Sequence, residues 1–158
     1  LRQQPGLEKL VIEQVSPECG VRETATIQGM ATVTAEDYQS GRVWEDAVCH
    51  SYYPIDLHIS SGTGLDMVML AEGVVPTIPR AALLPAGSRN FIVAGRCISS
   101  DRLANSALRV QASCMATGQA AGAMAALSVK CGLAPEELPM ADVRSLLREH
   151  KAIVPQDS

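Results

Sequence analysis

The chain has 158 residues, 47% of them hydrophobic and 19% charged, so it can bury a core and has the composition of a soluble globular protein. Its net charge is −4, and only 3% of its residues are aromatic. Nucleic-acid surfaces depend on clustered positive charge and on aromatic stacking, so the composition argues against a nucleic-acid partner.

The five cysteines stand at wide, irregular spacings without a Cys-x-x-Cys pair, which predicts reduced, mostly buried thiols and no metal site. Residues 1–6 contain neither an initiator methionine nor an apolar signal core. The sequence therefore contains no recognisable targeting signal, and the compartment stays undetermined, with the cytoplasm favoured. We expect the chain to be part of a longer protein.

Two strands are expected near the N-terminus. Residues 7–15 alternate loosely between apolar and polar positions and stop before Pro17. Residues 21–29 alternate charged or threonine positions with small or apolar ones. Together the two segments predict a β-hairpin or two neighbouring strands of one sheet.

A short helix is expected next. Thr34 is its predicted N-cap, acidic residues follow in the first turn, and Gly41 stands where the helix should end. The following residues, 43–50, fit either a strand or a buried helix, because their pattern has no clear period.

The middle of the chain predicts extended structure. Residues 52–58 should be extended because Pro54 disfavours a helical conformation in the residue before it. After a break rich in glycine and serine, residues 67–75 and 78–84 predict two strands, and residues 90–94 predict a last, buried strand.

The last part of the chain predicts helices. Residues 104–130 read as one uninterrupted helix, which would be about 39 Å long at 1.5 Å per residue, and Gly132 should end it. A shorter amphipathic helix is expected at residues 142–151, with Val143, Leu146 and Leu147 on one face.

One segment has the length of a membrane span, because residues 110–129 contain no charge. It consists mostly of alanine, glycine, serine and threonine, which gain little from contact with lipid. The spacing of Gly118 and Gly122 equally suits tight helix packing inside a soluble fold. We therefore expect no membrane partner.

The most informative stretch is a predicted strand, loop and helix near the C-terminus: Asn90-Phe91-Ile92-Val93-Ala94-Gly95-Arg96-Cys97-Ile98-Ser99-Ser100, Ser106-Ala107-Leu108-Arg109-Val110-Gln111 and Cys114-Met115-Ala116-Thr117-Gly118-Gln119-Ala120-Ala121-Gly122. A helix N-terminus offers N–H groups and partial positive charge to an electron-rich ligand, and small side chains let a flat ring approach closely. The stretch resembles the C-terminal end of FAD-dependent oxidoreductases of the glutathione-reductase-like superfamily, in particular the family related to fumarate reductase flavoproteins.

The resemblance continues upstream in four ordered blocks: Val21-Arg22-Glu23-Thr24, Gly41-Arg42-Val43-Trp44-Glu45-Asp46-Ala47-Val48, Tyr53-Pro54-Ile55-Asp56-Leu57-His58 and Ile78-Pro79-Arg80-Ala81-Ala82-Leu83-Leu84-Pro85. Members of the family are longer and begin with a strand, a Gly-rich turn and a helix that hold the FAD pyrophosphate. The nearest candidate here, Gly62-Thr63-Gly64-Leu65-Asp66-Met67, has methionine in place of the third glycine and reads as a surface turn. The resemblance therefore implies a C-terminal fragment of a flavoprotein, whose partner is the missing N-terminal part of the same parent chain.

By matching position, the resemblance implies a set of FAD-binding residues. Gly95 and Arg96 would lie beside the ribityl or phosphate region of the cofactor. A second group would lie near the edge of the flavin ring: Ser106, Ala107, Leu108, Arg109 and Val110. Reduced flavin gains negative charge at this edge, and helix N–H groups would stabilise that charge.

His58 and Arg109 are the catalytic candidates. An imidazole readily exchanges protons near neutral pH, and Asp56, two residues away in an extended strand, would lie on the same side. The alternatives are a structural histidine and a solvated arginine, although a cation in the first turn of a helix opposes the helix dipole. Arg42 and Arg80 could each bind a substrate carboxylate or form a structural ion pair.

The expected fold is α+β, with mixed strands and one long buried helix, as a C-terminal fragment of a FAD/NAD(P)-binding Rossmann-like flavoprotein. Residues 1–88 would form a β-rich segment on the substrate side, residues 89–131 the FAD-contacting strand, loop and helix, and residues 132–158 an amphipathic helix and tail. The expected function is hydride transfer through FAD to or from an unknown small-molecule substrate. The alternative is a non-catalytic fragment or interaction module that binds no cofactor, for which a homodimer formed by strand exchange is open.

Overall fold

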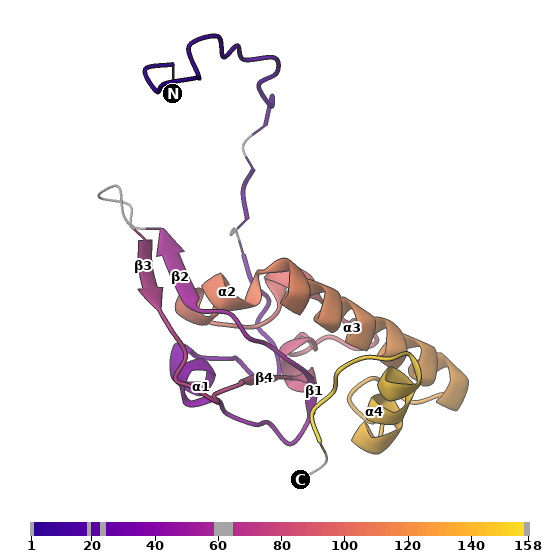
Figure 1. Cartoon of the computed structure of the whole chain (residues 1–158). Coiled ribbons are helices and arrows are strands. Elements are labelled where there is room, and N and C mark those ends of the chain that lie inside the picture. Colours follow the sequence, from indigo (N-terminus) through magenta and orange to yellow (C-terminus); the bar gives the residue numbers. More distant parts are fainter. Residues whose placement is uncertain (1, 19, 23–24, 59–64, 157–158) are drawn as a thin grey trace.

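The computed structural model describes residues 2–18, 20–22, 25–58 and 65–156, with the main chain alone at residues 57, 58, 65 and 66. Figure 1 shows the arrangement of its elements. In chain order these are α1 (Ala35–Ser40), β1 (Ala47–His50), β2 (Ile55–His58), β3 (Leu65–Val68), β4 (Thr77–Pro79), the 3-10 turns η1 (Arg80–Ala82) and η2 (Gly95–Cys97), α2 (Arg102–Leu108), α3 (Gln111–Cys131) and α4 (Met140–Glu149).

Helices and strands are mixed in the described part, in line with the predicted α+β class. The strands form two separate antiparallel pairs. β1 pairs with β4, so that His50 lies opposite Thr77. β2 pairs with β3, so that His58 lies opposite Leu65. Both pairs are small and pack against helices, because a two-stranded ribbon alone has too little buried surface to be stable.

The predictions for the middle of the chain hold in outline. Residues 43–50 form a strand in their second half, and residues 52–54 lead without regular structure into β2. The strand predicted at residues 67–75 begins earlier and ends at Val68, and residues 78–84 turn from β4 into η1. The surface turn proposed at residues 62–64 lies outside the described residues.

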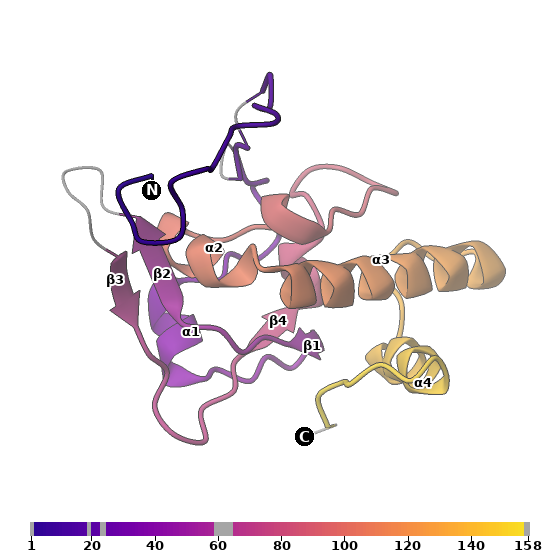
Figure 2. The ribbon, with the colours of Figure 1, turned by 45° about the horizontal axis from the view of Figure 1, so that its top comes forward.

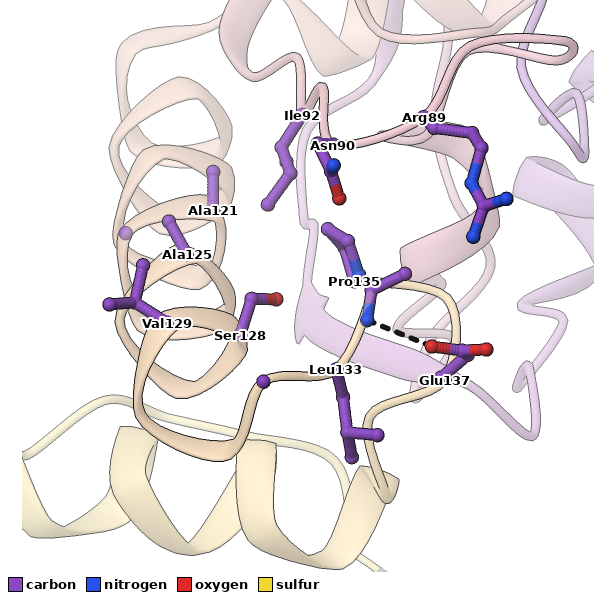
Figure 3. Close-up of a pocket in the computed structure, with 13 residues that line it drawn as sticks. Arg89, Asn90, Ile92, Ala121, Ala125, Ser128, Val129, Leu133, Pro135 and Glu137 are labelled. Carbon is purple, nitrogen blue, oxygen red and sulfur yellow. Dashed lines mark hydrogen bonds between the residues drawn. The ribbon is translucent and has the colours of Figure 1, made fainter.

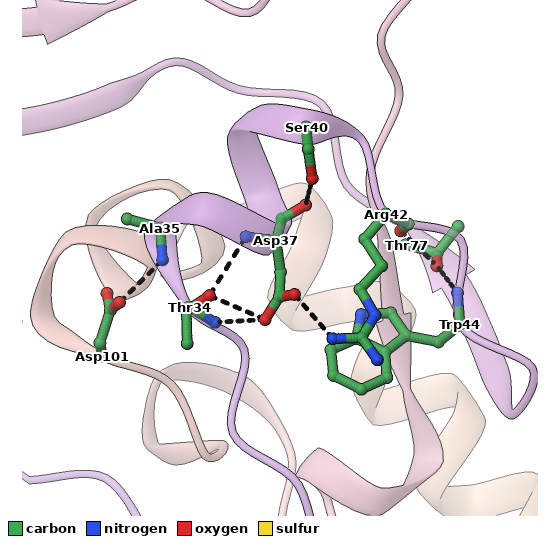
Figure 4. Close-up of polar contacts among 8 residues, drawn as sticks. All are labelled: Thr34, Ala35, Asp37, Ser40, Arg42, Trp44, Thr77 and Asp101. Carbon is green, nitrogen blue, oxygen red and sulfur yellow. Dashed lines mark hydrogen bonds and ion pairs between the residues drawn. The ribbon is translucent and has the colours of Figure 1, made fainter.

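α1 begins and ends where its sequence signals predict. The Thr34 hydroxyl accepts a hydrogen bond from the main-chain N–H of Asp37 at 3.1 Å, and the Asp37 carboxylate accepts one from the main-chain N–H of Thr34 at 3.1 Å. Gly41 ends the helix with φ at 72°, a left-handed conformation that favours glycine. Arg42 lies 2.7 Å from Asp37 and stacks 3.6 Å above the Trp44 ring, as Figure 4 shows. Arg42 is therefore a structural residue in this fold.

The core joins segments that lie far apart in the chain. Its largest fully buried side chains come from nearly every element: Tyr38, Ile55, Ile78, Leu83, Ile98, Leu108, Met124 and Leu147. Burying one such side chain contributes about 1.5–3 kcal/mol. A hydroxyl chain runs through this core, since Ser51 Oγ lies 3.1 Å from the Tyr38 hydroxyl and 2.8 Å from Ser113 Oγ. These contacts fasten α1 and α3 to the end of β1.

Two arginines hold α4 against the rest of the fold. Arg144 is 5% exposed, and its Nε donates to the main-chain oxygen of Ala47 at 3.0 Å. Arg80 Nη1 donates to the main-chain oxygen of Leu138 at 2.6 Å, just before the helix. Arg80 therefore acts structurally, through carbonyl groups. The amphipathic helix predicted at residues 142–151 is confirmed as α4.

The single helix predicted over residues 104–130 is wrong. The chain forms α2 and α3 instead, and Val110 between them is extended, with φ at −68° and ψ at 154°. The Cys114 thiol lies 3.4 Å from the main-chain oxygen of Arg109, where it offers a weak donor to a carbonyl at the break. Gly132 ends α3 in a left-handed conformation, as predicted. No proline or glycine marks the break, so helical periodicity alone could not locate it.

The prediction that this helix is buried is also wrong, because α3 buries one stripe only. The stripe consists of Ser113, Thr117, Ala120 and Met124. The opposite face, with Gly118 and Gly122, is exposed, and a Cβ atom on either glycine would meet no other described atom within 4 Å. Figure 1 and Figure 2 both show α3 running along one side of the molecule.

Three predicted strands are not strands in the described residues. Residues 7–15 lie away from the folded body (Figure 1), with Ile12 80% exposed, so no neighbouring strand satisfies their main chain. The described part of residues 21–29 makes an isolated bridge at Gly29. Residues 90–94 have no regular structure, since Asn90 lies at a bend with φ at 55° and Phe91 is 58% exposed. The predicted hairpin between the first two segments is therefore wrong as well.

Candidate functional site

η2, α2 and α3 meet around a cavity of about 430 Å³. Its lining residues come from η2, from the junction of α2 and α3, and from the first turns of α3: Arg96, Arg109, Gln111, Cys114 and Met115. The volume falls within the range of small-molecule pockets, about 300–1,000 Å³. Two of the residues predicted to contact a cofactor thus meet at one cavity.

The start of α3 forms one wall of this cavity. Its N-cap, Val110, has no side-chain oxygen that could accept a hydrogen bond, and none of its first-turn residues is acidic. The N-terminal end of this 21-residue helix therefore keeps its partial positive charge. Arg96 and Arg109 add formal positive charge beside it. The electrostatics of the cavity favour an anionic or electron-rich group.

Arg109 lies largely buried at the helix junction. It is 9% exposed and is the C-cap of α2, not a first-turn residue as the sequence suggested. A cation at a helix C-terminus is favourable, so the expected conflict with the helix dipole does not arise. Arg109 Nη2 donates to the main-chain oxygen of Asp56 at 3.5 Å. This contact ties the junction to β2.

The η2 turn is fixed against both helices. Gly95 has φ at 79°, in the left-handed region, and its main-chain N–H donates to Thr117 Oγ1 at 3.0 Å. The main-chain oxygen of Arg96 accepts a hydrogen bond from Asn105 Nδ2 at 3.0 Å. The exposed Arg96 side chain therefore starts from a fixed main-chain position at the edge of the cavity.

Three further predicted residues lie inside the fold. Ser106, Ala107 and Leu108 are each 1% exposed or less. Ser106 Oγ accepts a hydrogen bond from the main-chain N–H of Asp56 at 3.1 Å and donates to a carbonyl within α2 at 2.7 Å. The predicted residues at or directly beside the cavity are Gly95, Arg96, Arg109 and Val110, whereas the other three side chains belong to the core.

The catalytic candidate His58 ends β2, and its side chain lies outside the described part of the structure. The contact predicted between His58 and Asp56 therefore stays a prediction. The carboxylate of Asp56 is described, and its Oδ1 is buried without a hydrogen-bond partner among the described atoms. The main chain of Asp56 contacts both Ser106 and Arg109, so β2 lies directly against α2 and the helix junction.

Three lining residues escaped the sequence reasoning. Gln111, Cys114 and Met115 follow the i, i+3, i+4 spacing of one helix face, a signal that becomes useful only once the start of α3 is known. Burial raises the pKa of the Cys114 thiol and outweighs the positive charge of Arg96, which lowers it, while Cys97 raises it further. Cys114 is therefore mainly a thiol at neutral pH.

A larger cavity of about 760 Å³ lies further along α3. Figure 3 shows Ala121 and Ala125 on the helix facing Ile92, and Ser128 pointing toward Pro135. Its walls are mainly small or apolar and include none of the residues predicted to act in binding or catalysis. The smaller cavity is the better candidate for the functional site, because charged groups and a helix N-terminus converge there.

The chain thus folds as an α+β protein in which two arginines and the start of α3 meet at one cavity. The chain belongs to the FAD dependent oxidoreductase family, whose model matches residues 1–147. No curated protein and no solved structure matches the chain.

Among the described helices, α3 included, none has the length and apolar character that crossing a membrane requires. Within the same described residues, no three histidine, cysteine or acidic side chains come together as a metal site would need.

Proposed function

We propose that this chain forms the flavin-contacting part of a FAD-dependent oxidoreductase that acts on a small-molecule substrate. The observation that carries the proposal is the cavity at which Arg96, Arg109 and the uncapped start of α3 converge. FAD suits this chemistry because it carries a diphosphate and a ring whose edge becomes electron-rich on reduction. When bound, FAD would supply hydride transfer to or from the substrate.

Each group at the cavity has its own role in this proposal. The exposed Arg96 side chain binds the ribityl or phosphate region next to Gly95. The N–H groups of the first turn of α3 donate hydrogen bonds to the carbonyl edge of the ring, beside Val110. Arg109, held by Asp56, adds positive charge and requires little reorganisation. Ser106, Ala107 and Leu108 support this wall from the core.

The proposal includes a partner, the N-terminal part of the same parent chain. That part would supply the strand, Gly-rich turn and helix of a Rossmann-like fold, to which residues 89–131 contribute. Residues 1–88 would then line the substrate side, with residues 132–158 packed outside. Two observations support a missing partner: residues 90–94 form no strand and leave Phe91 exposed, and one face of α3 is uncovered within the described residues. The non-catalytic alternative is less favoured, because the family match covers residues 1–147.

The test is the visible absorption spectrum of the purified chain after incubation with excess FAD and desalting. We expect flavin absorbance to be retained, and the replacements Arg96→Met and Arg109→Met each to weaken retention about tenfold, as expected for the loss of one charge-assisted contact. Arg102→Met is the matched control, since Arg102 is exposed on α2 and does not line the cavity. Equal losses in all three variants would contradict the proposed site.

His58 is proposed to hold or move a proton near the substrate. In a preparation that turns over, His58→Gln should leave flavin retention unchanged, lower kcat and remove a limb of the pH–rate profile near the usual histidine pKa of about 6.5. An unchanged pH profile would assign His58 a structural role.

A further inference from the structure

The larger cavity, of about 760 Å³, is lined by α3 and by loop residues from 89–92 and 132–137. Its helical wall is made mainly of small residues, among them Ala121, Gly122 and Ala125. Ile92 faces this wall from the loop that precedes η2, as Figure 3 shows. Small side chains let a flat ring approach a helix closely, so the space between the two walls suits a planar aromatic group.

The helical wall also carries a buried polar group. Ser128 Oγ is buried and has no hydrogen-bond partner among the described atoms. Figure 3 shows the hydroxyl pointing away from α3 toward Pro135, which lines the same cavity. A buried polar group without a partner costs free energy, so this hydroxyl favours a cavity ligand that supplies a hydrogen bond.

The charged residues that line the cavity are Arg89 and Glu137. Glu137 Oε2 accepts a hydrogen bond from the main-chain N–H of Ala134 at 2.9 Å, so this carboxylate already has a partner in the loop after α3. The side chains of Arg89 and its neighbour Asn90 form no hydrogen bond or ion pair with the described residues. The guanidinium group can therefore pair with an anionic group of a ligand.

We propose that this cavity is a second ligand site, which binds a planar aromatic molecule with one anionic substituent. The ring lies between the small residues of α3 and Ile92, a polar atom of the ligand bonds to Ser128, and the anionic group pairs with Arg89. The site is distinct from the proposed flavin site, since Ala121 follows Met115 on α3 by roughly 9 Å at 1.5 Å per residue. The inference goes beyond the proposed function and does not rest on it.

Two fluorescent dyes with the same aromatic rings test the two parts of the site. Anilinonaphthalene sulfonate carries an anionic group, and phenylnaphthylamine lacks it. Titration of the full chain should show saturable binding of both dyes, with one dye per chain. Arg89→Met should weaken the sulfonate dye about tenfold and leave the neutral dye unchanged, as expected for the loss of one charge-assisted contact. Ser128→Ala should weaken both dyes about fivefold, because both lose the same hydrogen bond.

Such dyes also bind to exposed apolar surface in general, so a matched pair of glycine variants locates them. Gly122→Leu puts a side chain into the cavity and should weaken both dyes at least tenfold. Gly118→Leu puts the same side chain one helical turn away, outside the lining, and should leave both unchanged. A Cβ atom on either glycine would meet no other described atom within 4 Å, and leucine favours a helix more than glycine does, so both variants should fold. Circular dichroism checks this.

Arg96→Met is a further control, because Arg96 lines the smaller cavity and not the larger one. The proposal is overturned if binding does not saturate, if the two glycine variants behave alike, or if Arg89→Met weakens both dyes equally. Weaker binding to Arg96→Met would place the dyes in the smaller cavity and overturn it too. The same holds if the chain is a dimer that Gly122→Leu dissociates, because a second copy would then fill the cavity. A chain that retains no flavin but binds the dyes as expected would contradict the proposed function and support this inference.

Discussion

The start of α1 and the start of α3 are built in opposite ways. At α1, the Thr34 hydroxyl and the Asp37 carboxylate satisfy main-chain N–H groups, and Asp101 Oδ2 accepts a further hydrogen bond from Ala35 at 2.7 Å (Figure 4). At α3, the first residue is preceded by Val110, which cannot accept a hydrogen bond through its side chain, and the first turn contains no acidic residue. Side chains of the protein therefore accept hydrogen bonds from the free N–H groups at the start of α1, whereas the N-cap side chain of α3 accepts none.

The helix starts that contribute to stability differ from the one at which we propose that a ligand binds. α2 is capped by Asp101 Oδ1, 2.7 Å from the main-chain nitrogen of Ala104, and α4 has Asp142 in its first turn. At α3 the chain instead gathers Arg96 and Arg109, which adds positive charge to a positive helix end. The C-terminal end of α2 stabilises the charge of Arg109, but no acidic residue stands in the first turn of α3 to offset the positive charge at its start. The helix starts that have carboxylates, those of α1, α2 and α4, therefore stabilise the fold. The start of α3 has none, and it is the one at which we propose that a ligand binds.

The largest expected effect on stability is at Asp101, whose carboxylate accepts hydrogen bonds from the first turns of α1 and α2. Asp101→Ala removes the acceptor for both α1 and α2, and we expect a loss of roughly 2–3 kcal/mol in the free energy of unfolding, since one cap contributes about 0.5–2 kcal/mol. Urea titration followed by circular dichroism measures it. Asp101→Asn keeps an acceptor and should lose less. A loss below about 1 kcal/mol for Asp101→Ala would show that water replaces the carboxylate at both helices.

A smaller loss, about 1 kcal/mol, is expected for Asp37→Ala, which breaks the reciprocal cap of α1 and the ion pair with the half-exposed Arg42. Glu36→Ala is the matched control, because Glu36 shares the first turn but is exposed. The same urea titration should rank Asp37→Ala well below Glu36→Ala in stability. Equal losses would mean that only the helix dipole, and not the hydrogen bonds of Asp37, matters.

The cap of α1 should also show in the pH dependence of stability. Burial acts to raise the pKa of Asp37, but hydrogen bonds from Arg42 and Thr34 outweigh it, so the pKa is lowered from its ordinary value of 3.8. A group with a lowered pKa stabilises the fold above its unfolded pKa, and this stabilisation is lost as the pH falls through the folded pKa. The stability gap between wild type and Asp37→Ala should therefore be constant near pH 7 and shrink below about pH 3.8. A gap that persists at low pH would contradict this origin.

A substitution at Val110 would give the start of α3 a side-chain cap like that of α1. Val110→Asp should raise the stability of the chain without cofactor by roughly 0.5–1 kcal/mol, because it supplies the missing cap and a favourable charge. The same carboxylate should reduce FAD retention, since it occupies the site proposed for the ring edge. Val110→Ser supplies the cap without charge and should reduce retention less. Unchanged retention in Val110→Asp would place the flavin elsewhere.

The smallest effect concerns the exposed face of α3. Gly118→Ala should stabilise the isolated chain by about 0.5 kcal/mol, because alanine favours a helix and its Cβ atom would meet no described atom within 4 Å. Gly95→Ala is the contrasting variant and should destabilise, since φ at that position is 79°. Thermal unfolding measures both. Destabilisation by Gly118→Ala would mean that the face is already covered, for example in a homodimer.

Sequence reasoning worked best where a signal acts over a few residues. Thr34 and Gly41 bound α1 as predicted, and Gly132 ends α3. It failed where structure depends on distant contacts. Residues 90–94 have the composition of a buried strand, but a strand forms only beside another strand. The break at Val110 has no local signal either, and it turned Arg109 from an unfavourable first-turn cation into a favourable C-cap.

The candidate site divides in the same way. Arg96 and Arg109 were identified from the resemblance of their sequence blocks, whereas Gln111, Cys114 and Met115 became visible only when the start of α3 was located. The sequence by itself determined the family, the α+β class, the caps of α1 and the C-terminal helix, because these depend on local pattern and composition. Tertiary structure decided where the long helix breaks, which of its faces is buried and which charges converge at one cavity. Those outcomes depend on contacts between segments far apart in the chain, such as Asp56 with Arg109 and Gly95 with Thr117.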